Sequence, residues 1–546
     1  MLTLLNPLEQ SGFQQAMAGL EVAEASDRYL DEQLRLSLVL LQAWGVLRLA
    51  HVNDEPVAAW GIPLGTSRRP DGDTLDQYLQ AIVARDEAEA GQATVGARLG
   101  QVRPGGLIDQ AQRDSLRCWA DAGLLAGDVW YFDGHTVEYS GQAAIGKTKH
   151  GTKRMSLPAI DQYTLANGVV TLTDYFPTSV SYATALRQMV GKANAALPPA
   201  YRIRKLAFDK EGWDVALLKW VAEEADIALV TWVKNTSVNQ SLLAAVADEE
   251  FVPLPETMTL GKGPQSQVLQ VADTQVTFPD LGVQRVLVLE TDQPRRLAIY
   301  TTAAAPQETT LADDHTITTI GLLETMRLKQ RIENRFKIEV HEMAGDAIPT
   351  HQTLTVTQTE PYDLDQAQRQ RHNAQKRWQR YDQQSQQQLQ LYEAGQVDKQ
   401  AFNLLQRRTQ RLRHKAEKQV ATLTDELAAL TLDQDGRTCL SRTCQVLDLR
   451  KLTLLALFKS HALVALAILA RQLGLDGAGP QRLRRQFLAH GDRVVFDPQQ
   501  QIATVYAKPF PRRATRDAYE RLCALLQDVP ITLERDGLVY RVRFSC

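Results

Sequence analysis

The chain has 546 residues, 61 Lys plus Arg against 64 Asp plus Glu, and 44% hydrophobic residues, so its formal net charge is -3. This composition excludes a disordered tail, a collagen-like fibre and a small disulfide scaffold, and at about 150 residues per domain the length predicts three or four domains. The charge is unevenly placed, because residues 1–100 hold 7 arginines, no lysine and 14 acids, for a local net charge of -7. The sequence therefore predicts a globular protein with a polarised charge distribution.

The cysteines and the apolar segments bear on the compartment. The five cysteines are scattered and form no C-x-x-C pair, which favours a reducing cytoplasm and argues against a structural zinc site. We expect no secretory signal sequence at the start of the chain. The longest strongly apolar stretch, Ser460 to Ala470, has eleven residues between two basic residues, and this length predicts a buried helix rather than a membrane span.

The first part of the chain, residues 1–125, is predicted to form a helical N-terminal domain. Tyr29 to Leu49 is a long leucine-rich segment. Thr74 to Val83 is a second helical segment, and it follows a proline and an acidic cap at Asp73.

An α/β domain is predicted next, over residues 126–237 and 313–345. Strands are expected at Val129–Tyr139, Ser156–Leu165 and Val169–Tyr175, and the dipeptide Asn167-Gly168 suits a two-residue hairpin turn between the last two. A helix, a strand, a helix and a strand should follow, at residues 181–196, 204–208, 215–225 and 227–233. The predicted order is therefore βββαβαβ, completed by a helix from Thr318 to about Glu342 after a β-rich insertion over residues 238–312.

The last third of the chain should hold two more parts. Residues 365–432 carry helical signals on both sides of Gly395 and Asp398, which predicts an antiparallel helical hairpin or coiled coil. Residues 438–546 should form a small α+β domain with a basic helix at 480–490. The residues expected in the seam of the hairpin are Leu405, Leu412, Val420, Leu423, Leu427 and Leu430.

Two aspartates stand out on the predicted strands. Asp133 lies on an aromatic strand, on the same alternation as Val129 and Tyr131, where an ionised carboxylate is costly unless it binds a metal or is hydrogen-bonded. Asp209 comes at the end of the strand at 204–208, with Gly212 nearby to let the chain turn, and strand ends are where α/β folds usually bind ligands. The alternative for each aspartate is a turn or capping role.

A third carboxylate is selected by the geometry of the helix at 318–342. Since each residue turns about 100°, Glu333 shares a face with Met326 and Phe336, whereas Glu324 and Glu342 lie on the opposite face. Lys329 and Lys337 flank Glu333 at one turn on either side. The cations around this glutamate are either ordinary i, i+4 salt bridges or a set for phosphate.

Taken together, these residues resemble the DDE transposases of bacterial insertion sequences, which have a ribonuclease H-like core. The matching motifs are Tyr131-Phe-Asp133-Gly-His135, Leu206-Ala-Phe-Asp209-Lys-Glu-Gly212-Trp213 and Arg331-Ile-Glu333-Asn334-Arg-Phe336-Lys337. The resemblance covers roughly residues 125–345. The chain departs from the insertion-bearing branch of that family, which usually has an aromatic residue and an arginine where this sequence has Met326 and Lys329.

The resemblance implies an activity, a cofactor and partners. It implies hydrolysis of a phosphodiester bond at the transposon ends and strand transfer into target DNA, with Asp133, Asp209 and Glu333 as ligands of two Mg²⁺ or Mn²⁺ ions. It also implies double-stranded DNA as the partner, a homodimer that brings two ends together, and a bacterial, nucleoid-associated protein of the cytoplasm.

Basic segments provide candidate DNA contacts. Residues 369–418 hold 12 Lys plus Arg and 4 acids, a local net charge of +8, although a solvated or dimerising coiled coil has the same pattern. The candidate DNA-binding residues lie in a loop between the first two strands, around Glu333, and in the hairpin: Lys147, Lys149, Lys153, Arg154, Lys329, Arg335, Lys337, Arg407, Arg408, Arg411 and Arg413.

Two other functions fit the same sequence. A nuclease of the same fold would cut DNA without joining it. A non-catalytic DNA-binding or assembly protein would retain the fold as a scaffold and use the basic hairpin.

Overall fold

The structure is a computed structural model of the chain, and it forms two compact units, Met1–Gln352 with Leu447–Cys546 (unit 1) and Thr353–Val446 (unit 2). Each unit is described separately below. The described residues are 2–22, 26–46, 49–54, 62–64, 66, 69–89, 102–125, 129–139, 155–164, 169–176, 180–259, 267–291, 296–305, 317–329, 353–361, 363–432, 438–475, 483, 488, 491–507, 513–527, 531–535 and 538–545.

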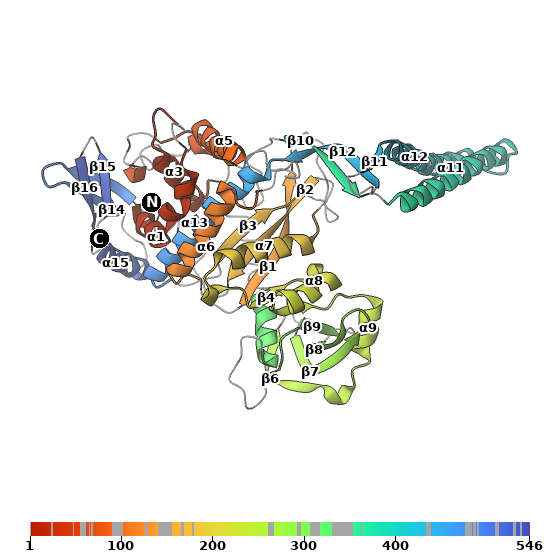
Figure 1. Cartoon of the computed structure of the whole chain (residues 1–546), viewed down its shortest axis with the longest axis horizontal. Helices are drawn as coiled ribbons and strands as arrows, with labels where there is room; N and C mark the ends of the chain where they lie inside the picture. The colour runs from red at the N-terminus through yellow and green to blue at the C-terminus, as the bar shows by residue number, and fades with distance from the viewer. Residues whose placement is uncertain are drawn as a thin grey trace. The chain divides into compact units, whose positions relative to one another are not determined.

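The main sheet of unit 1 has nine strands in the order β3-β2-β1-β4-β5-β9-β8-β7-β6 (Figure 1). Strands β1, β2 and β3 pair antiparallel, whereas β1, β4 and β5 pair parallel, so the sheet is mixed. The strands are β1 (Val129–Tyr139), β2 (Met155–Thr164), β3 (Val169–Tyr175), β4 (Lys205–Phe208), β5 (Ala228–Trp232), β6 (Val252–Thr259), β7 (Gln267–Phe278), β8 (Gly282–Thr291) and β9 (Leu297–Thr301).

The helices between the parallel strands begin at side-chain caps. The Ser181 hydroxyl accepts a hydrogen bond from the Thr184 N–H at the start of α7 (Tyr182–Ala196), and Asp214 accepts one from Leu217 at the start of α8 (Val215–Lys219). Such caps satisfy donors that have no partner within the helix. The remaining elements of this part are η5 (Pro199–Tyr201), η6 (Lys210–Gly212), a π-helical turn η7 (Trp220–Glu224), α9 (Ser237–Ala244) and η8 (Asp248–Glu250).

The β-rich segment, predicted as an insertion between the core strands and the following helix, joins the main sheet. Strand β9 pairs antiparallel with β5, with Thr231 opposite Tyr300, so β6 to β9 extend the same sheet. This extension packs against the turn after β4 through aromatic rings. The centroid of the Trp213 ring lies 5.6 Å from that of Phe278 and 5.4 Å from that of Tyr300. The extension therefore belongs to the core of unit 1.

An arginine on β8 holds the helix that follows the sheet, at residues 319–329. The Arg285 guanidinium donates to the carbonyl oxygens of Ala303 and Ile317 and pairs with Asp273 at 2.6 Å. The Thr319 hydroxyl donates to the same carboxylate at 2.6 Å. These contacts fix the start of the helix against the β7–β8 hairpin.

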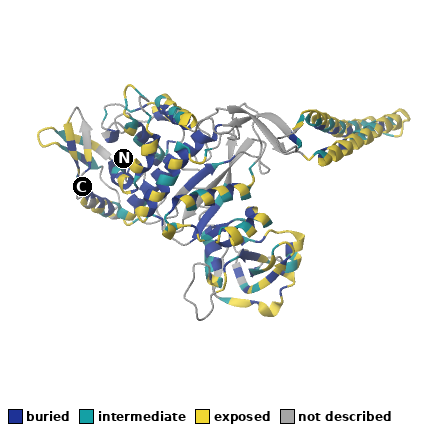
Figure 2. Cartoon of the chain, viewed as in Figure 1, coloured by how far each residue is buried: buried dark blue, intermediate teal, exposed yellow. Residues whose placement is uncertain are grey.

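The described residues of the N-terminal region hold helices and no strand, but they do not form a core of their own. Its helices pack around α13 (Leu449–Gln472), which is buried along most of its length and also contacts β3 (Figures 1 and 2). The helices are η1 (Leu2–Leu4), α1 (Leu5–Gln10), α2 (Phe13–Met17), η2 (Ala18–Leu20), α3 (Asp31–Trp44), η3 (Leu49–Asp54), η4 (Ile62–Leu64), α5 (Gly72–Glu89) and α6 (Leu107–Asp121).

Helix α13 corrects two predictions from the sequence. It has 24 residues, whereas the predicted apolar segment has eleven. It also packs against the N-terminal helices, whereas the sequence predicted it as part of a C-terminal domain. By length and composition alone it is the one described helix that could cross a membrane, but 83% of its most apolar window is buried inside the protein. A buried core helix accounts for this composition.

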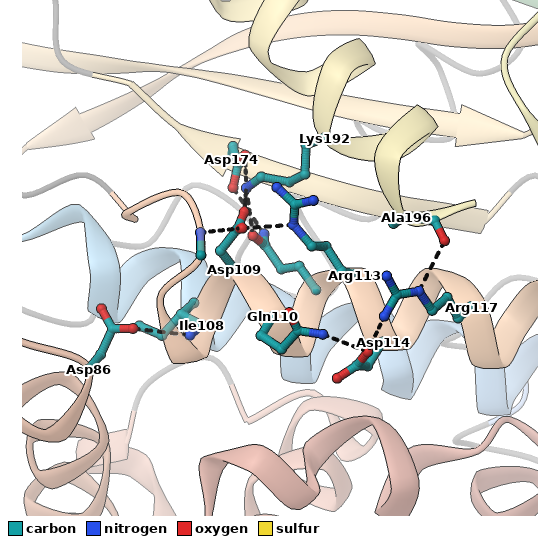
Figure 3. A network of polar contacts seen from close by, with 12 residues as sticks. Asp86, Ile108, Asp109, Gln110, Arg113, Asp114, Arg117, Asp174, Lys192 and Ala196 are labelled. Carbon is teal, nitrogen blue, oxygen red and sulfur yellow. Dashed lines mark hydrogen bonds and ion pairs between the residues drawn. The ribbon is translucent and has the colours of Figure 1, made fainter. Parts of the chain in front are cut away.

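A buried polar network joins α6 to α7 and β3 (Figure 3). The Lys192 ammonium lies 3.1 Å from Asp109 and 2.7 Å from Asp174, and it donates to Gln112 at 2.8 Å. Burial raises the pKa of the Asp109 carboxyl, but the charges of Lys192 and Arg113 and the Gly105 N–H outweigh it, so the pKa lies below its usual value. The network ties the helical layer to the sheet.

The end of the chain forms a small sheet in the order β13-β14-β16-β15 with α15 (Arg513–Gln527). Strands β14 and β16 pair parallel, and the other neighbours pair antiparallel. The strands are β13 (Gly491–Asp497), β14 (Ile502–Ala507), β15 (Thr532–Arg535) and β16 (Leu538–Ser545). The predicted basic helix at 480–490 lies outside the described residues, apart from Leu483 and Leu488.

Unit 2 contains the predicted helical hairpin, α11 (Leu364–Glu393) and α12 (Lys399–Ala428). Gly395 adopts φ +70° in the turn, and Asp398 caps α12 by accepting hydrogen bonds from Gln400 and Ala401. A three-stranded sheet accompanies the hairpin, with the order β10-β12-β11. Its strands are β10 (Thr353–Pro361), β11 (Leu430–Leu432) and β12 (Thr438–Leu447).

The hairpin seam differs from the predicted leucine seam. Leu423 is 7% exposed, but Leu405 and Leu412 are 41% and 37% exposed, and Leu430 belongs to a strand. Small and polar side chains occupy the buried positions instead, and the Gln388 amide donates to the Thr409 hydroxyl at 3.2 Å. Both helices are otherwise exposed along their length (Figure 2).

Candidate active site

Asp133 and Asp209 lie at the same level on neighbouring parallel strands. In the register of β1 and β4, Tyr131 is opposite Ala207, and both aspartates come two residues later. The backbone at Asp209 is still extended, with φ -80° and ψ 163°. Since side chains two residues apart share a face of the sheet, both carboxylates project from the same face.

The strands beneath these carboxylates are strongly apolar. Residues 129–132 of β1 and 206–208 of β4 are buried, and Phe132 and Phe208 have no exposed surface. Such runs are typical of strands that are covered on both faces. They give the two aspartates a rigid base.

Asp133 lies beside a buried ammonium group. Its carboxylate accepts a hydrogen bond from the Gly134 N–H at 3.0 Å, and the Lys329 Nζ lies 3.6 Å from the same oxygen. The Lys329 side chain is only 2% exposed, against 23% for Asp133. A buried ammonium requires an anionic or hydrogen-bonding partner, and Asp133 provides one.

Asp209 stands at a tight turn that requires glycine. Its carboxylate accepts a hydrogen bond from the Lys210 N–H at 2.7 Å and caps η6. A Cβ atom at Gly212 would lie 2.5 Å from the Phe208 ring and 2.9 Å from the Tyr182 ring. The spacing from Phe208 to Gly212 in the sequence thus reflects close packing under the carboxylate.

Tyr182, the first residue of α7, brings a hydroxyl group to the same region. Its ring lies 6.2 Å from that of Phe208, and its hydroxyl oxygen is buried and has no hydrogen-bond partner among the described residues. Burial raises the pKa of Tyr182 well above its usual value, and the negative charges of Asp133 and Asp209 raise it further. The hydroxyl therefore stays protonated beside the two carboxylates.

The sequence predicted a different role for Lys329 from the one that the structure shows, and it did not indicate Tyr182. Lys329 was predicted to contact DNA, and the structure places its ammonium inside the protein next to Asp133. Tyr182 was not predicted at all. No residue pattern around Tyr182 distinguishes it, because its position depends on how α7 packs against the end of β4.

The other predicted site residues of unit 1 lie outside the described residues. These residues are Glu333, Arg335, Lys337, Lys147, Lys149, Lys153 and Arg154. Within the described part of the chain, no three His, Cys, Asp or Glu side chains come together as a metal site would need. The candidate site is therefore a pair of carboxylates with a buried lysine and a buried tyrosine hydroxyl.

The donor set suits a hard divalent cation. Carboxylate oxygens are the ligands that Mg²⁺ takes from proteins, and it usually takes only one or two carboxylates and keeps several waters. Asp133 and Asp209 supply two such groups from a rigid sheet. The Lys329 ammonium opposes metal binding, since its positive charge lowers the affinity of Asp133 for a cation.

In unit 2, the predicted DNA-binding arginines divide into two groups. Arg407, Arg408 and Arg411 are exposed. Arg413 instead pairs with Asp382 across the hairpin at 2.8 Å. Since each residue of a helix turns about 100°, the three exposed arginines lie within about 60° of Arg411, and Arg413 lies about 160° away.

Comparisons with known proteins find a weak likeness among solved structures. No family model matches the chain, and no curated protein does. Among solved structures, the chain is similar to the cryo-EM structure of a piggyBac transposase synaptic complex with hairpin DNA, with a TM-score of 0.35 and 8% identity over 63% of this chain and 69% of that chain. A likeness at this level does not establish a family for the chain, nor an origin in a bacterial insertion sequence.

Proposed function

We propose that this chain is a DNA transposase that hydrolyses a phosphodiester bond at transposon ends and transfers the freed strand into target DNA. The observation that carries the proposal is the placement of Asp133 and Asp209 at one level on neighbouring parallel strands. The strand order β3-β2-β1-β4-β5, with the first three strands antiparallel, agrees with a ribonuclease H-like core, and we infer that core here.

Asp133, Asp209 and Glu333 would hold two Mg²⁺ or Mn²⁺ ions. Bound in pairs, such ions activate an attacking oxygen and stabilise a leaving one without a covalent enzyme intermediate. Glu333 enters the proposal from the sequence alone. It follows Lys329 by four residues, and Lys329 lies at Asp133.

The chain's own residues position the reaction. The buried strands fix the direction of the two carboxylates, and positioning accounts for much of the catalysis of phosphoryl transfer. The protonated hydroxyl of Tyr182 is available as a hydrogen-bond donor in the same region. Lys329 keeps one positive charge beside Asp133, which limits the repulsion between the carboxylates and a phosphate.

The basic hairpin of unit 2 would hold DNA through its phosphates. The exposed arginines of α12 form a stripe along one side of the helix, and arginine side chains of this kind can bind the phosphates of a duplex backbone. Two transposon ends must be brought together for transfer, so a homodimer belongs to the proposal. Lys147, Lys149, Lys153 and Arg154 are proposed as further phosphate contacts.

The test of the proposed function is cleavage by the full-length protein with Mg²⁺. A plasmid that carries the coding region with its flanking DNA serves as substrate, and cuts are mapped on both sides of the gene. We expect cleavage at fixed ends that is abolished in Asp209→Ala and retained in Glu224→Gln, a change of an exposed acid on η7. Full cleavage by Asp209→Ala contradicts the assignment.

A non-catalytic DNA-binding scaffold is the second candidate, and the Lys329–Asp133 pair favours it, because a buried ammonium already neutralises the first carboxylate. An enzyme and a scaffold differ in their response to Lys329→Met. Removing the ammonium should change the metal dependence of cleavage in an enzyme, whereas a scaffold cuts in neither form. A nuclease without transfer is separated by supplying pre-cleaved ends, which only a transposase joins to target DNA.

A further inference from the structure

The small C-terminal sheet of unit 1 has one covered face and one open face. Along β14 and β16, the buried side chains alternate with exposed or half-buried ones, and Val505 and Phe544 belong to the buried set. On α15, Tyr519 and Leu522 are buried with them. The helix therefore covers one face, and the residues between the buried ones form the other.

Three arginines lie on the open face, which we call the arginine face: Arg493 on β13, with Arg541 and Arg543 on β16. All three are exposed. In the strand register, Thr504 of β14 lies between Arg543 on one side and Val495 on the other. Arg541 and Arg543 are two residues apart on one strand, so their Cα atoms are roughly 6.6 Å apart on the same face.

One of these guanidinium groups is held in place. Arg493 lies opposite Tyr506 in the register, and its guanidinium carbon is 5.0 Å from the centre of the Tyr506 ring. Stacking restricts the arginine side chain but leaves the N–H groups at its edge able to bind phosphate. It also covers the ring, so Tyr506 is not available to stack on a base.

The charge of the arginine face is positive. Two acids lie on it by strand register, Asp497 of β13 and Glu534 of β15, which is opposite Val539, so three arginines against two acids give +1. Asp497 also accepts hydrogen bonds from the backbone of Gln499 and Gln500. On the exterior of α15, Arg513 and Arg516 each lie 3.8 Å from an acid one turn on, Asp517 and Glu520.

We propose that the arginine face binds the sugar-phosphate backbone of double-stranded DNA. Guanidinium groups match phosphate geometry in pairs of hydrogen bonds, and a face with a covered aromatic ring suits a duplex better than unstacked bases. The proposal rests on the proposed function in one respect, that DNA is the macromolecule this chain handles. It adds a DNA-binding surface in unit 1 that is independent of the hairpin in unit 2.

The test compares two pairs of substitutions in the full-length protein. Binding to a labelled duplex of mixed sequence is measured by fluorescence anisotropy at several salt concentrations. For Arg541→Ala with Arg543→Ala, we expect weaker binding and a slope of log K against log salt that is smaller by roughly 1.8, since each phosphate that an arginine neutralises adds about 0.9 to the slope. The control, Arg513→Ala with Arg516→Ala, should keep the slope within experimental error.

A second measurement needs no variant. Phenylglyoxal modifies exposed arginines, and peptide mapping with and without duplex shows which of them DNA protects. Protection of Arg541 and Arg543 supports the proposal. Equal modification in both samples overturns it, as does an unchanged slope in the double variant, and competition by poly-glutamate as strong as that by DNA points to an acidic protein instead.

These outcomes are separate from those of the cleavage test. Loss of cleavage in Asp209→Ala with an unchanged salt slope in the arginine variant overturns only the arginine face. A reduced slope with full cleavage by Asp209→Ala overturns only the catalytic assignment.

Discussion

Lys192 holds two carboxylates in the interior, and its removal should be costly. Asp109 and Asp174 are 1% and 11% exposed in their side chains. In Lys192→Met, Asp174 keeps its burial but loses this ion pair, and Asp109 keeps Arg113 as its partner at 2.8 Å. Because an unpaired buried charge is strongly unfavourable, we expect a loss of about 3–5 kcal/mol of unfolding free energy, measured by urea denaturation.

A more exposed pair on α6 provides the control for this change. Arg117 lies 2.9 Å from Asp114, and these side chains are 46% and 34% exposed. Arg117→Met should cost less than about 1 kcal/mol, since exposed pairs contribute little. Equal effects of the two substitutions argue against a structural role for the Lys192 network.

His461 should make the protein sensitive to acid. Burial lowers the pKa of His461 from 6.5 to about 3, and its ring packs between Phe13 and Trp119 at 5.2 and 4.9 Å. The unfolded chain therefore takes up a proton that the folded chain does not, in the window from about pH 6.5 down to about 3. Stability falls across this window by about 1.4 kcal/mol per pH unit from this group.

The contribution of His461 is isolated by comparing two proteins. Thermal unfolding is measured at pH 7.5 and pH 5.0 for the wild type and for His461→Gln. The variant lacks the titrating ring, so its Tm should fall less between the two pH values. Identical pH dependence in both proteins excludes His461 as the source, because the carboxylates are common to both.

The sequence predicted part of the candidate site. Strand alternation placed Asp133 inside an aromatic strand, and Gly212 marked the turn after Asp209, both from local pattern. The level of the two aspartates depends on the pairing of β1 with β4, about 75 residues apart in the chain, and the neighbours Lys329 and Tyr182 depend on helix packing. Neither leaves a periodic signal in the sequence.

At the scale of elements, the hairpin should be held by Leu423 rather than by Leu412. Leu423 is 7% exposed and Leu412 is 37% exposed, although both were expected in the seam. We expect Leu423→Ala to lower the protection of backbone amides in α11 and α12 against hydrogen exchange, because a buried leucine costs about 2–5 kcal/mol when truncated. Leu412→Ala should leave that protection almost unchanged, and the opposite ranking contradicts the observed seam.

The predicted leucine seam was wrong for a physical reason. In a Gln-rich and Arg-rich helix they are the strongest apolar signal, but the helices approach through small side chains such as Ala374 and Ala416, which are 0% and 5% exposed. Hydrogen bonds across the seam, Gln388 to Thr409 among them, then replace apolar packing. Polar residues that pair only in three dimensions are not recognisable as core from sequence.

The basic side of α12 should bind DNA without Arg413. Substituting Arg407, Arg408 and Arg411 by alanine should weaken duplex binding and reduce the salt slope by up to about 2.7. Arg413→Ala removes a group already paired with Asp382, so its slope should stay near that of the wild type. Loss of binding in Arg413→Ala alone indicates that the hairpin geometry matters more than the charge of the stripe.

The extension of the main sheet by β6 to β9 also could not be predicted from the sequence. The β-rich runs at residues 267–278, 285–290 and 296–301 predict β7, β8 and β9 close to their observed bounds, because alternation is local. Their membership of the same sheet as β1 depends on the antiparallel pairing of β5 with β9, across the intervening α9 and β6 to β8. A β-rich run gives no signal that tells an independent domain from an added sheet edge.

For the whole molecule, the net charge of -3 combines regions of opposite sign. The first 100 residues carry -7 and residues 369–418 carry +8. The acidic part belongs to the helical layer of unit 1, where α13 is buried, and the basic part belongs to the hairpin of unit 2. We thus assign phosphate binding to the hairpin and to the arginine face. Metal binding is assigned to Asp133 and Asp209 of unit 1.

The measurement that tests the central claim most directly is Mn²⁺ binding to the full-length protein by isothermal titration calorimetry, which needs no DNA substrate. We predict saturable binding by the wild type and by Glu224→Gln, and loss of that binding in both Asp133→Ala and Asp209→Ala, with unchanged thermal unfolding as the control for folding. Mn²⁺ binding that survives both aspartate substitutions, or that is absent from the wild type, contradicts the claim that these two carboxylates form a metal-dependent active site.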